Sequence, residues 1–189
     1  MVNVTGVITL EQLAKDFTSL FQRRVFRLET LDFYDAANER EPYAAFLAGQ
    51  PVDPAWRRPW QGLVRGVRES GRTMERVHIV SEPVTDYIRF SLLHGYPASV
   101  EAGEDVRILG LLAANEAGLR RDDFWLFDDD LAALLTYDGD GRVERVNLTN
   151  EPAALALLRG TRDRALRLAS PLALYVADHK ITRERTRTA

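Results

Sequence analysis

The stretch Asp122–Asp130 reads DDFWLFDDD and is the most apolar short run of the chain, closed by aspartates at both ends. Side chains alternate between the two faces of a strand, so Trp125 and Phe127 would share one face, and Phe124 and Leu126 the other. Because both faces are apolar, the stretch predicts a strand that is buried on both sides. A strand of this kind belongs at the centre of a sheet.

The residues after this strand predict an antiparallel meander. Leu131–Tyr137 and Val143–Leu148 are apolar, strand-like runs, and the glycines of Gly139–Gly141 are typical of a hairpin turn between them. A long helix over Glu151–Ser170 follows, and we expect Asn150 to cap it.

The residues before the central strand alternate between helical and strand patterns, which favours parallel strands joined by crossover helices. Thr9 and Gln12 form a capping box for the first helix. Gly95–Gly103 is expected to be a loop, and Leu111–Leu119 fits a helix or an extended loop. The other expected elements are strands Arg24–Thr30, Thr73–Val80 and Asp105–Leu109 and helices Glu39–Gly49, Ala55–Gly71 and Val84–Leu93.

These patterns together predict an α/β fold, with α+β as the alternative, in which helices cover a mixed β-sheet. A length of 189 residues fits one globular domain over residues 1–178 and a basic, flexible tail over 179–189.

Composition excludes several classes of protein. The chain has no cysteine, so disulfides, thiolate nucleophiles and cysteine-ligated metals are excluded. A net charge of −3 argues against a general nucleic-acid binder, although the arginines of Ala55–Arg72 would allow a local basic surface. No signal peptide or membrane-spanning run is recognisable, so we expect a cytoplasmic protein that does not associate with membranes.

Two charged residues, Arg27 and Glu29, lie two positions apart on a predicted strand and therefore point to the same face. On an internal strand they would have to be paired or to line a cleft, whereas on an edge strand they would simply be solvated. Both interpretations are open.

The turn Ser81–Pro83 connects a predicted strand to a predicted helix. Ser81 and Glu82 could cap that helix or contact an anionic ligand at its N-terminus. On the helix itself, Asp86 and Arg89 are spaced to form a pair, and Tyr87 could reach either the core or a cleft.

Further charged residues lie beside the other strands. Arg107 lies with Glu104 and Asp105 at the start of another predicted strand, and Asp128 and Asp129 follow the central strand. Such carboxylates could bind a divalent metal or a cationic ligand, share a proton, or form a solvated turn that protects the sheet. We expect Asp128 and Asp129 to lie at the same end of the sheet as the Ser81–Pro83 turn.

No metal or cofactor is predicted. The histidines have no metal-ligand spacing, and Asp138–Gly141 resembles a calcium loop whose twelfth position holds Thr149 instead of glutamate. Phosphate-binding and dinucleotide-binding glycine patterns are also missing from the sequence.

Four motifs carry a resemblance to a known family. FRLET at Phe26–Thr30, the Val80–Arg89 stretch, AGEDVR at Ala102–Arg107 and DFWLFDD at Asp123–Asp129 resemble, in the same order, an actinobacterial domain family of unknown function. The scarcity of lysine also suggests a GC-rich, actinobacterial genome. Members of that family resemble proteins encoded beside helix-turn-helix regulators and in specialised-metabolite gene clusters.

The late strands and the helix after them also resemble, more distantly, phospholipase D-like folds. Catalytic members of that group need a His-x-Lys motif. Here His179 and Lys180 are adjacent, and His94 is followed by Gly95 and Tyr96. The resemblance therefore implies the fold without its phosphodiesterase chemistry.

Two function hypotheses follow. The first is a non-catalytic domain that senses a small-molecule ligand or binds a partner, for which the resemblance suggests a helix-turn-helix regulator. The alternative is an enzyme of specialised metabolism whose cleft combines Glu29, Glu82, Asp86, Arg89 and Asp128 for acid–base chemistry. Whether the chain is catalytic and whether it forms a homodimer are open. The full set of candidate ligand-binding residues is Arg27, Glu29, Ser81, Glu82, Asp86, Tyr87, Arg89, Arg107, Asp128 and Asp129.

Overall fold

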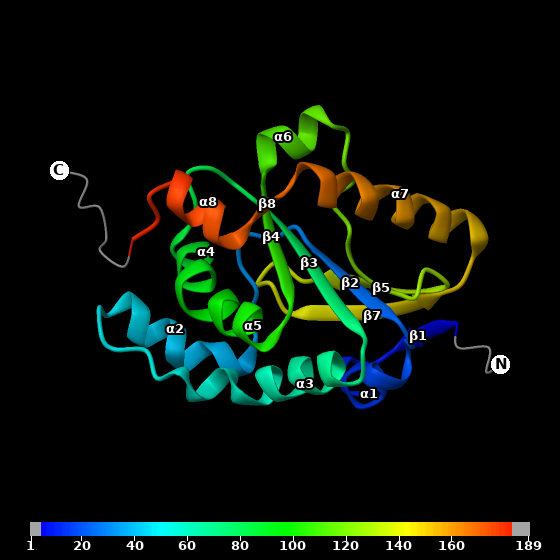
Figure 1. The fold of residues 1–189 in the computed structure, drawn as a ribbon, viewed down its shortest axis with the longest axis horizontal. Coiled ribbons are helices and arrows are strands. Elements are labelled where there is room, and N and C mark those ends of the chain that lie inside the picture. Colours follow the sequence, from blue (N-terminus) through cyan, green and yellow to red (C-terminus); the bar gives the residue numbers. More distant parts are fainter. Residues whose placement is uncertain (1–4, 183–189) are drawn as a thin grey trace.

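The computed structural model describes residues 5–182. They form an eight-stranded mixed sheet in the order β1-β7-β6-β5-β2-β3-β4-β8, with helices on both faces (Figure 1). The strands are β1 (Gly6–Ile8), β2 (Arg24–Glu29), β3 (Thr73–Val80), β4 (Asp105–Gly110), β5 (Asp123–Phe127), β6 (Leu131–Tyr137), β7 (Val143–Thr149) and β8 (Ser170–Pro171).

The helical elements include both α-helices and short 3-10 or π turns. The α-helices are α1 (Leu10–Asp16), α2 (Arg40–Leu47), α3 (Arg58–Glu69), α4 (Asp86–Phe90), α5 (Tyr96–Ala102), α6 (Leu111–Glu116), α7 (Pro152–Leu168) and α8 (Leu172–Asp178). The short turns are η1 (Phe17–Ser19), η2 (Ala37–Glu39), η3 (Pro54–Arg57) and the π-helical η4 (Ser91–Gly95). No helix of the described residues is both long and apolar enough to cross a membrane.

The sheet confirms the predicted α/β architecture. β2, β3 and β4 run parallel, whereas β5, β6 and β7 form an antiparallel meander. β5 lies between β6 and β2 and is antiparallel to both, so the direction of the sheet changes at the β2–β5 seam. DFWLF is therefore a central strand, as its sequence predicts.

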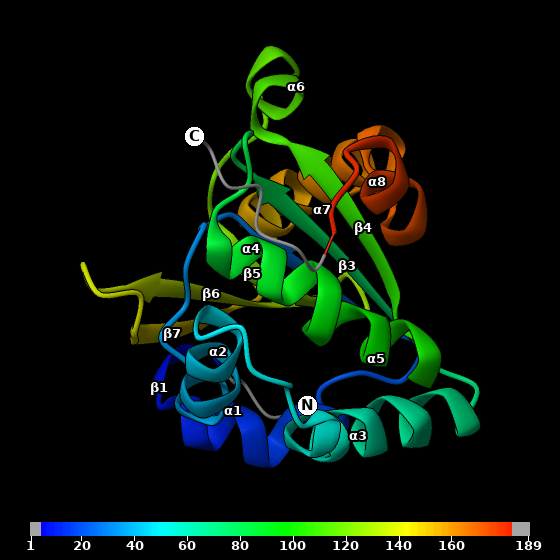
Figure 2. The ribbon, with the colours of Figure 1, turned by 90° about the vertical axis from the view of Figure 1, so that its left-hand side faces the viewer.

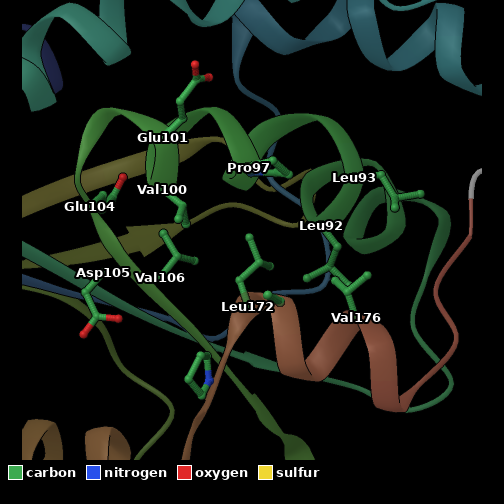
Figure 3. Close-up of a pocket in the computed structure, with 12 residues that line it drawn as sticks. Leu92, Leu93, Pro97, Val100, Glu101, Glu104, Asp105, Val106, Leu172 and Val176 are labelled. Atoms are coloured by element: carbon green, nitrogen blue, oxygen red, sulfur yellow. The ribbon is translucent and has the colours of Figure 1, made fainter.

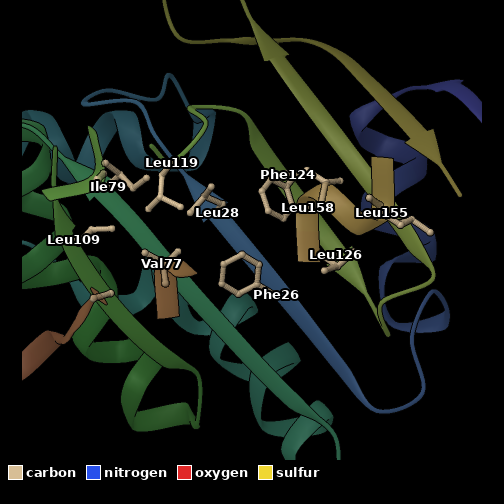
Figure 4. Close-up of a cluster of buried hydrophobic side chains, with 14 residues drawn as sticks. Phe26, Leu28, Val77, Ile79, Leu109, Leu119, Phe124, Leu126, Leu155 and Leu158 are labelled. Carbon is tan, nitrogen blue, oxygen red and sulfur yellow. The ribbon is translucent and has the colours of Figure 1, made fainter. Parts of the chain in front are cut away.

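Figure 2 shows α6 and α7 on one side of the sheet and α1 to α5 on the other. On the α7 side the centre of the core is an apolar cluster. Phe26, Phe124 and Leu126 of the central strands contact Leu155 and Leu158 of α7 (Figure 4). Strand alternation supplies this layer, because β2, β3 and β5 direct every second side chain to it.

The opposite face of the sheet carries two separate apolar clusters. One surrounds Phe17, Trp60 and Trp125 beneath α1 and α3. The other surrounds Tyr87, Phe90 and several neighbours beneath α4, α5 and α8. Buried polar side chains of β2 and β3 lie on this face as well.

Three expectations about local structure need correction or completion. Gly95–Gly103, expected to be a loop, is mostly helix α5: Pro97 lies in its first turn, where a missing N–H costs little, and Gly103 ends it at a φ of 115°. Leu111–Glu116 is helical. Asn150 does not cap the long helix, whose N-cap position is Glu151 without a side-chain cap bond.

The end of the chain is described only in part. The expected tail begins at His179, and residues 183–189 lie outside the described residues. α8 follows a break after α7, at the two-residue strand β8, which pairs with β4.

Asp128–Asp130 form the tight turn between β5 and β6, with Asp128 and Asp129 at φ values of 49° and 76°. The expectation that this turn lies at the same sheet end as Ser81–Pro83 is wrong. β5 is antiparallel to β2 and β3, so its last residues lie beside the first residue of β2, and Asp128 N–H bonds to the carbonyl of Arg24. The first residue of β5, Asp123, is the one at the other end.

The side chain of Asp128 fixes this turn to the start of β2. Its carboxylate accepts hydrogen bonds from the backbone N–H groups of Gln22, Arg23 and Arg24. Although partial burial raises the pKa of Asp128, these hydrogen bonds outweigh that effect and lower it. The residue therefore has a structural role.

We expect Asp128→Ala to lower the free energy of unfolding by about 1–2 kcal/mol, because three backbone donors lose their acceptor. Denaturant unfolding of this variant measures the loss. Asp130→Ala is the matched control, because Asp130 is an exposed aspartate of the same turn, and its loss should stay within about 0.5 kcal/mol. Equal effects of the two variants would contradict the role given to Asp128.

Candidate functional site

A layer of charged side chains lies on the helix-covered face of β2 and β3. In the parallel register Arg27 is next to Arg76, and Glu29 is next to His78. All four side chains point to the same face, and each of these residues is at most 9% exposed. Because β2 pairs with β5 on one side and β3 on the other, the edge-strand interpretation of Arg27 and Glu29 is excluded.

Asp123 anchors this layer on the β5 side. Its carboxylate accepts a hydrogen bond from Arg27 Nη2 at 2.8 Å and from Thr30 Oγ1 at 2.7 Å. The hydroxyls of Tyr34 and Tyr137 also donate to it, at 2.7 and 3.2 Å. This many donors are needed, since a carboxylate that is only 4% exposed has no water to replace them.

Arg76 connects two further carboxylates. Its Nη1 lies 2.5 Å from Glu29 Oε1, and its Nε lies 2.8 Å from Glu104 Oε1. The indole N–H of Trp60 donates to the second oxygen of Glu104 at 3.0 Å. Glu104 is only 2% exposed, so these bonds are its means of satisfying a buried charge.

His78 is hydrogen-bonded through both ring nitrogens. Nε2 is 2.8 Å from the carbonyl oxygen of Leu31, which can only accept, so Nε2 donates to it. Nδ1 is 2.6 Å from the hydroxyl of Tyr96, which itself donates to Glu29 Oε2 at 2.8 Å. The Tyr96 hydroxyl therefore connects His78 to Glu29.

Ion pairs connect the members of the layer. Arg27 and Arg76 pair with the carboxylates of Glu29, Asp123 and Glu104. Burial raises the pKa of Glu29, but the charges of Arg76, His78 and Arg27 outweigh burial and hold that pKa well below its usual range. Glu29 is therefore a fixed anion and a poor proton acceptor.

A small enclosed cavity of about 140 Å³ adjoins this layer. Glu29 and Arg76 form its wall on the sheet side, and helical elements and the segment after β2 close it. Its lining residues are Glu29, Tyr34, Ala36, Glu39, Arg57, Arg76, Tyr87, Ser91, Gly95 and Tyr96.

Glu39 and Arg57 are the charged residues of this wall that are least satisfied. Glu39 Oε2 accepts from the hydroxyl of Tyr87 at 2.6 Å, but Oε1 lies 4.0 Å from Arg57 Nη1. Arg57 Nη2 donates to Ser99, whereas its buried Nε has no hydrogen-bond partner among the described residues. Burial accordingly raises the pKa of Glu39 and lowers that of Arg57.

The structure brings together three of the residues predicted from sequence. Glu29 and Tyr87 line the cavity, and Arg27 contacts Glu29 from the neighbouring layer, with Nε 3.6 Å from Oε1. The ring of Tyr87 packs in the apolar cluster beneath α4 and its hydroxyl bonds Glu39 at the cavity, so both of its alternatives apply.

The other candidates lie elsewhere. Ser81 donates to Asp32, and the cap of α4 is Thr85, so the capping role expected of Ser81 and Glu82 is wrong. Glu82 accepts from the hydroxyl of Tyr175 at 2.8 Å and pairs with His179.

The remaining charged candidates are also outside the cavity wall. Asp86 is in the first turn of α4, and Arg89 donates to the carbonyl of Thr182. Arg107 pairs with Asp105 on β4. Asp129 pairs with Arg24 and Arg162 at the opposite sheet end.

Sequence reasoning missed most of the site, including Asp123, Arg76, Glu39, Arg57, Tyr34 and Tyr96. One signal was available: β3 carries Arg76 and His78 two positions apart, as β2 carries Arg27 and Glu29. Two such strands predict a shared polar layer if they are neighbours. The contributions of Glu39 and Arg57 have no comparable signal, because both come from the short 3-10 turns η2 and η3.

A larger hollow of the described surface lies elsewhere. This groove of about 700 Å³ lies between α5 and α8, with Val106 of β4 at its floor (Figure 3). Figure 3 shows mainly aliphatic side chains facing it, such as Val100, Leu172 and Val176. It lacks convergent polar groups, so it is the weaker candidate for a small polar ligand. Among the described residues no group of three or more histidines and carboxylates is placed to hold a metal ion.

Comparison with known proteins gives a family and a distant structural neighbour. No curated protein matches the chain. Among solved structures, NucT from Helicobacter pylori is similar over 87% of this chain and 96% of that chain, at 13% identity and a TM-score of 0.48. That similarity assigns no role to any residue. Residues 11–177 match the domain of unknown function DUF6879, and the chain therefore belongs to the DUF6879 family.

Proposed function

We propose that the chain is a non-catalytic, ligand-sensing domain that binds a small polar molecule in the cavity beside the charged layer. The observation that carries this proposal is the incomplete satisfaction of Glu39 and Arg57 inside an enclosed space. Buried polar groups are normally hydrogen-bonded, so these two would gain most from a ligand. A cavity of about 140 Å³ is close to one of roughly 150 Å³ that holds benzene, which limits the ligand to a few heavy atoms.

The bonding within the charged layer supports a binding role over a catalytic one, although Arg27 Nη1 has no hydrogen-bond partner among the described residues. Arg27, Arg76 and Asp123 are bonded to other protein groups, and the low pKa of Glu29 makes it a poor acid or base at neutral pH. Of the five residues that the enzyme alternative needs, only Glu29 lines the cavity. These groups would instead hold the cavity wall in place.

The enzyme alternative keeps one supporting observation, the raised pKa of Glu39. A carboxyl group whose pKa is shifted towards neutrality is a candidate acid or base. Turnover of a bound molecule that is lost in Glu39→Gln would favour the enzyme.

The partner part of the proposal, a helix-turn-helix regulator of an actinobacterium, is supported by the motif resemblance alone. The apolar groove between α5 and α8 is the surface that such a contact would use, since its aliphatic side chains include the 44% exposed Val100. Val100→Glu should abolish co-elution with a true partner and leave ligand binding in the polar cavity intact. Loss of both, or of neither, would contradict this division of the surface.

A thermal-shift screen of small polar metabolites tests the ligand proposal. A molecule that binds only the native state at about 100 times its Kd stabilises it by about 2.7 kcal/mol, so the melting temperature should rise by several degrees. The rise should disappear in Arg57→Gln and persist in Arg58→Gln, because the neighbouring Arg58 is exposed and outside the cavity. A rise that survives Arg57→Gln would place the ligand elsewhere.

A further inference from the structure

We propose that the ligand of this cavity is a small zwitterion, whose carboxylate binds Arg57 and whose ammonium group binds Glu39. This inference rests on the proposed ligand-binding function and narrows it to one chemical class. It follows from the charge of the wall, from the free hydrogen-bonding capacity of two residues, and from the size of the space.

The charge of the wall is balanced. Its acidic side chains are Glu29 and Glu39, and its basic side chains are Arg57 and Arg76. A net charge brought in by a ligand would therefore have no free counter-charge in this poorly solvated space. A neutral overall charge is therefore favoured for the guest.

The hydrogen-bonding atoms of the wall that are still free are a donor on Arg57 and an acceptor on Glu39. Arg76 already bonds Glu29 and Glu104, and both oxygens of Glu29 are in use. Arg57 Nη1, which only donates, and Glu39 Oε1, which only accepts when ionised, lie 4.0 Å apart, too far for a hydrogen bond to each other. A guest must therefore present an acceptor to the first and a donor to the second.

Charged ends on the guest satisfy these groups better than neutral ones do. Glu39 and Arg57 are both largely buried, their nearest charged atoms are 4.0 Å apart, and burial disfavours the ionised form of each. An ammonium group at Oε1 and a carboxylate at Arg57 Nη1 would offset that cost through charge-assisted hydrogen bonds. A cavity of about 140 Å³ suits a zwitterion of the size of alanine, serine, β-alanine or proline.

The test compares these four amino acids with size-matched molecules that lack one or both charges: propionate, isopropylamine and lactamide. Binding is followed by calorimetry and by the ¹⁵N–¹H signal of Arg57 Nε in arginine-labelled protein, assigned by its loss in Arg57→Gln. At least one zwitterion should shift this signal and bind about 10-fold or more tightly than each matched molecule.

Variants separate the two contacts. Glu39→Gln keeps an acceptor for Tyr87 but loses the charge, so it should weaken the zwitterion about 10-fold or more and leave propionate binding unchanged or improved. Arg57→Lys should retain part of the affinity that Arg57→Gln loses, because it keeps the charge without the planar fork. Glu41→Gln and Arg58→Gln, both at exposed neighbours, are the controls.

The outcomes distinguish the two proposals. If propionate, isopropylamine or lactamide shifts the Arg57 signal and binds as tightly as the amino acids, the zwitterion inference is overturned and the ligand-binding function stands. If no molecule of this panel or of the metabolite screen moves the signal, both are overturned.

Discussion

An Asp123→Ala protein is expected to lose about 3–5 kcal/mol of unfolding free energy, because Arg27 would remain buried without its principal counter-charge. The side chains of Arg27 and Asp123 are 4% and 2% exposed, so water does not reach either charge readily. The hydroxyls of Tyr34 and Thr30 would lose their acceptor in the same variant. Urea unfolding monitored by circular dichroism measures the loss, and Asp123→Asn gives a milder variant if Asp123→Ala does not fold.

Asp122→Ala is the matched control for this prediction. Asp122 precedes Asp123 in the sequence but pairs with Arg120 at the surface, with side-chain exposures of 37% and 57%. Such exposed pairs contribute about 0–1 kcal/mol. If both variants lost the same small amount, Asp123 would not be the anchor that its five hydrogen bonds indicate.

Glu29→Gln is expected to be destabilised by about 3 kcal/mol at pH 7 and to respond less to acid than the wild type. The folded-state pKa of Glu29 lies below its unfolded value, which is about 4.3. The unfolded state therefore takes up the proton first. The stability contributed by the carboxylate is fully present above that value and is lost as the pH falls towards the folded pKa.

Unfolding curves at a series of pH values from about 7 to 3 test this prediction. The difference between wild type and Glu29→Gln should shrink as the pH falls below about 4, because the wild type loses the charge that the variant never had. Glu69→Gln, at an exposed glutamate of α3, should follow the wild type throughout. A constant difference across this range would mean that Glu29 is not held as an anion by Arg76, His78 and Arg27.

Parts of the fold could be predicted wherever a local sequence pattern has only one structural explanation. DFWLF is apolar on both faces, so its central position followed from burial alone. The capping box of Thr9 and Gln12 and the positive φ of Gly49 were likewise local features, and all are present. The helical state of Gly95–Gly103 was missed because Gly95 and Pro97 suggest a loop, whereas here they lie beside and inside a continuous helical run against α3 and β4.

The site was harder to predict because its position depends on strand direction. Asp123 begins β5 and Asp128 directly follows it, and nothing local determines which of them meets the end of β2. Only the antiparallel β2–β5 pairing places Asp123 there and Asp128 at the start. Glu39 and Arg57 reach the cavity because η2 and η3 pack beside it. No periodic pattern in the sequence predicts that packing.

The seam between β2 and β5 has a consequence for how the protein is made. Arg27 and Asp123 are 96 residues apart in sequence, so a ribosome releases β2, β3 and β4 well before the strand that neutralises Arg27. Until then the nascent sheet has an open edge along β2 with a cation on it. That edge resists wrong pairing, as inward-pointing charges do on natural sheet edges. The long loop that must close also makes this step a late and slow one in folding.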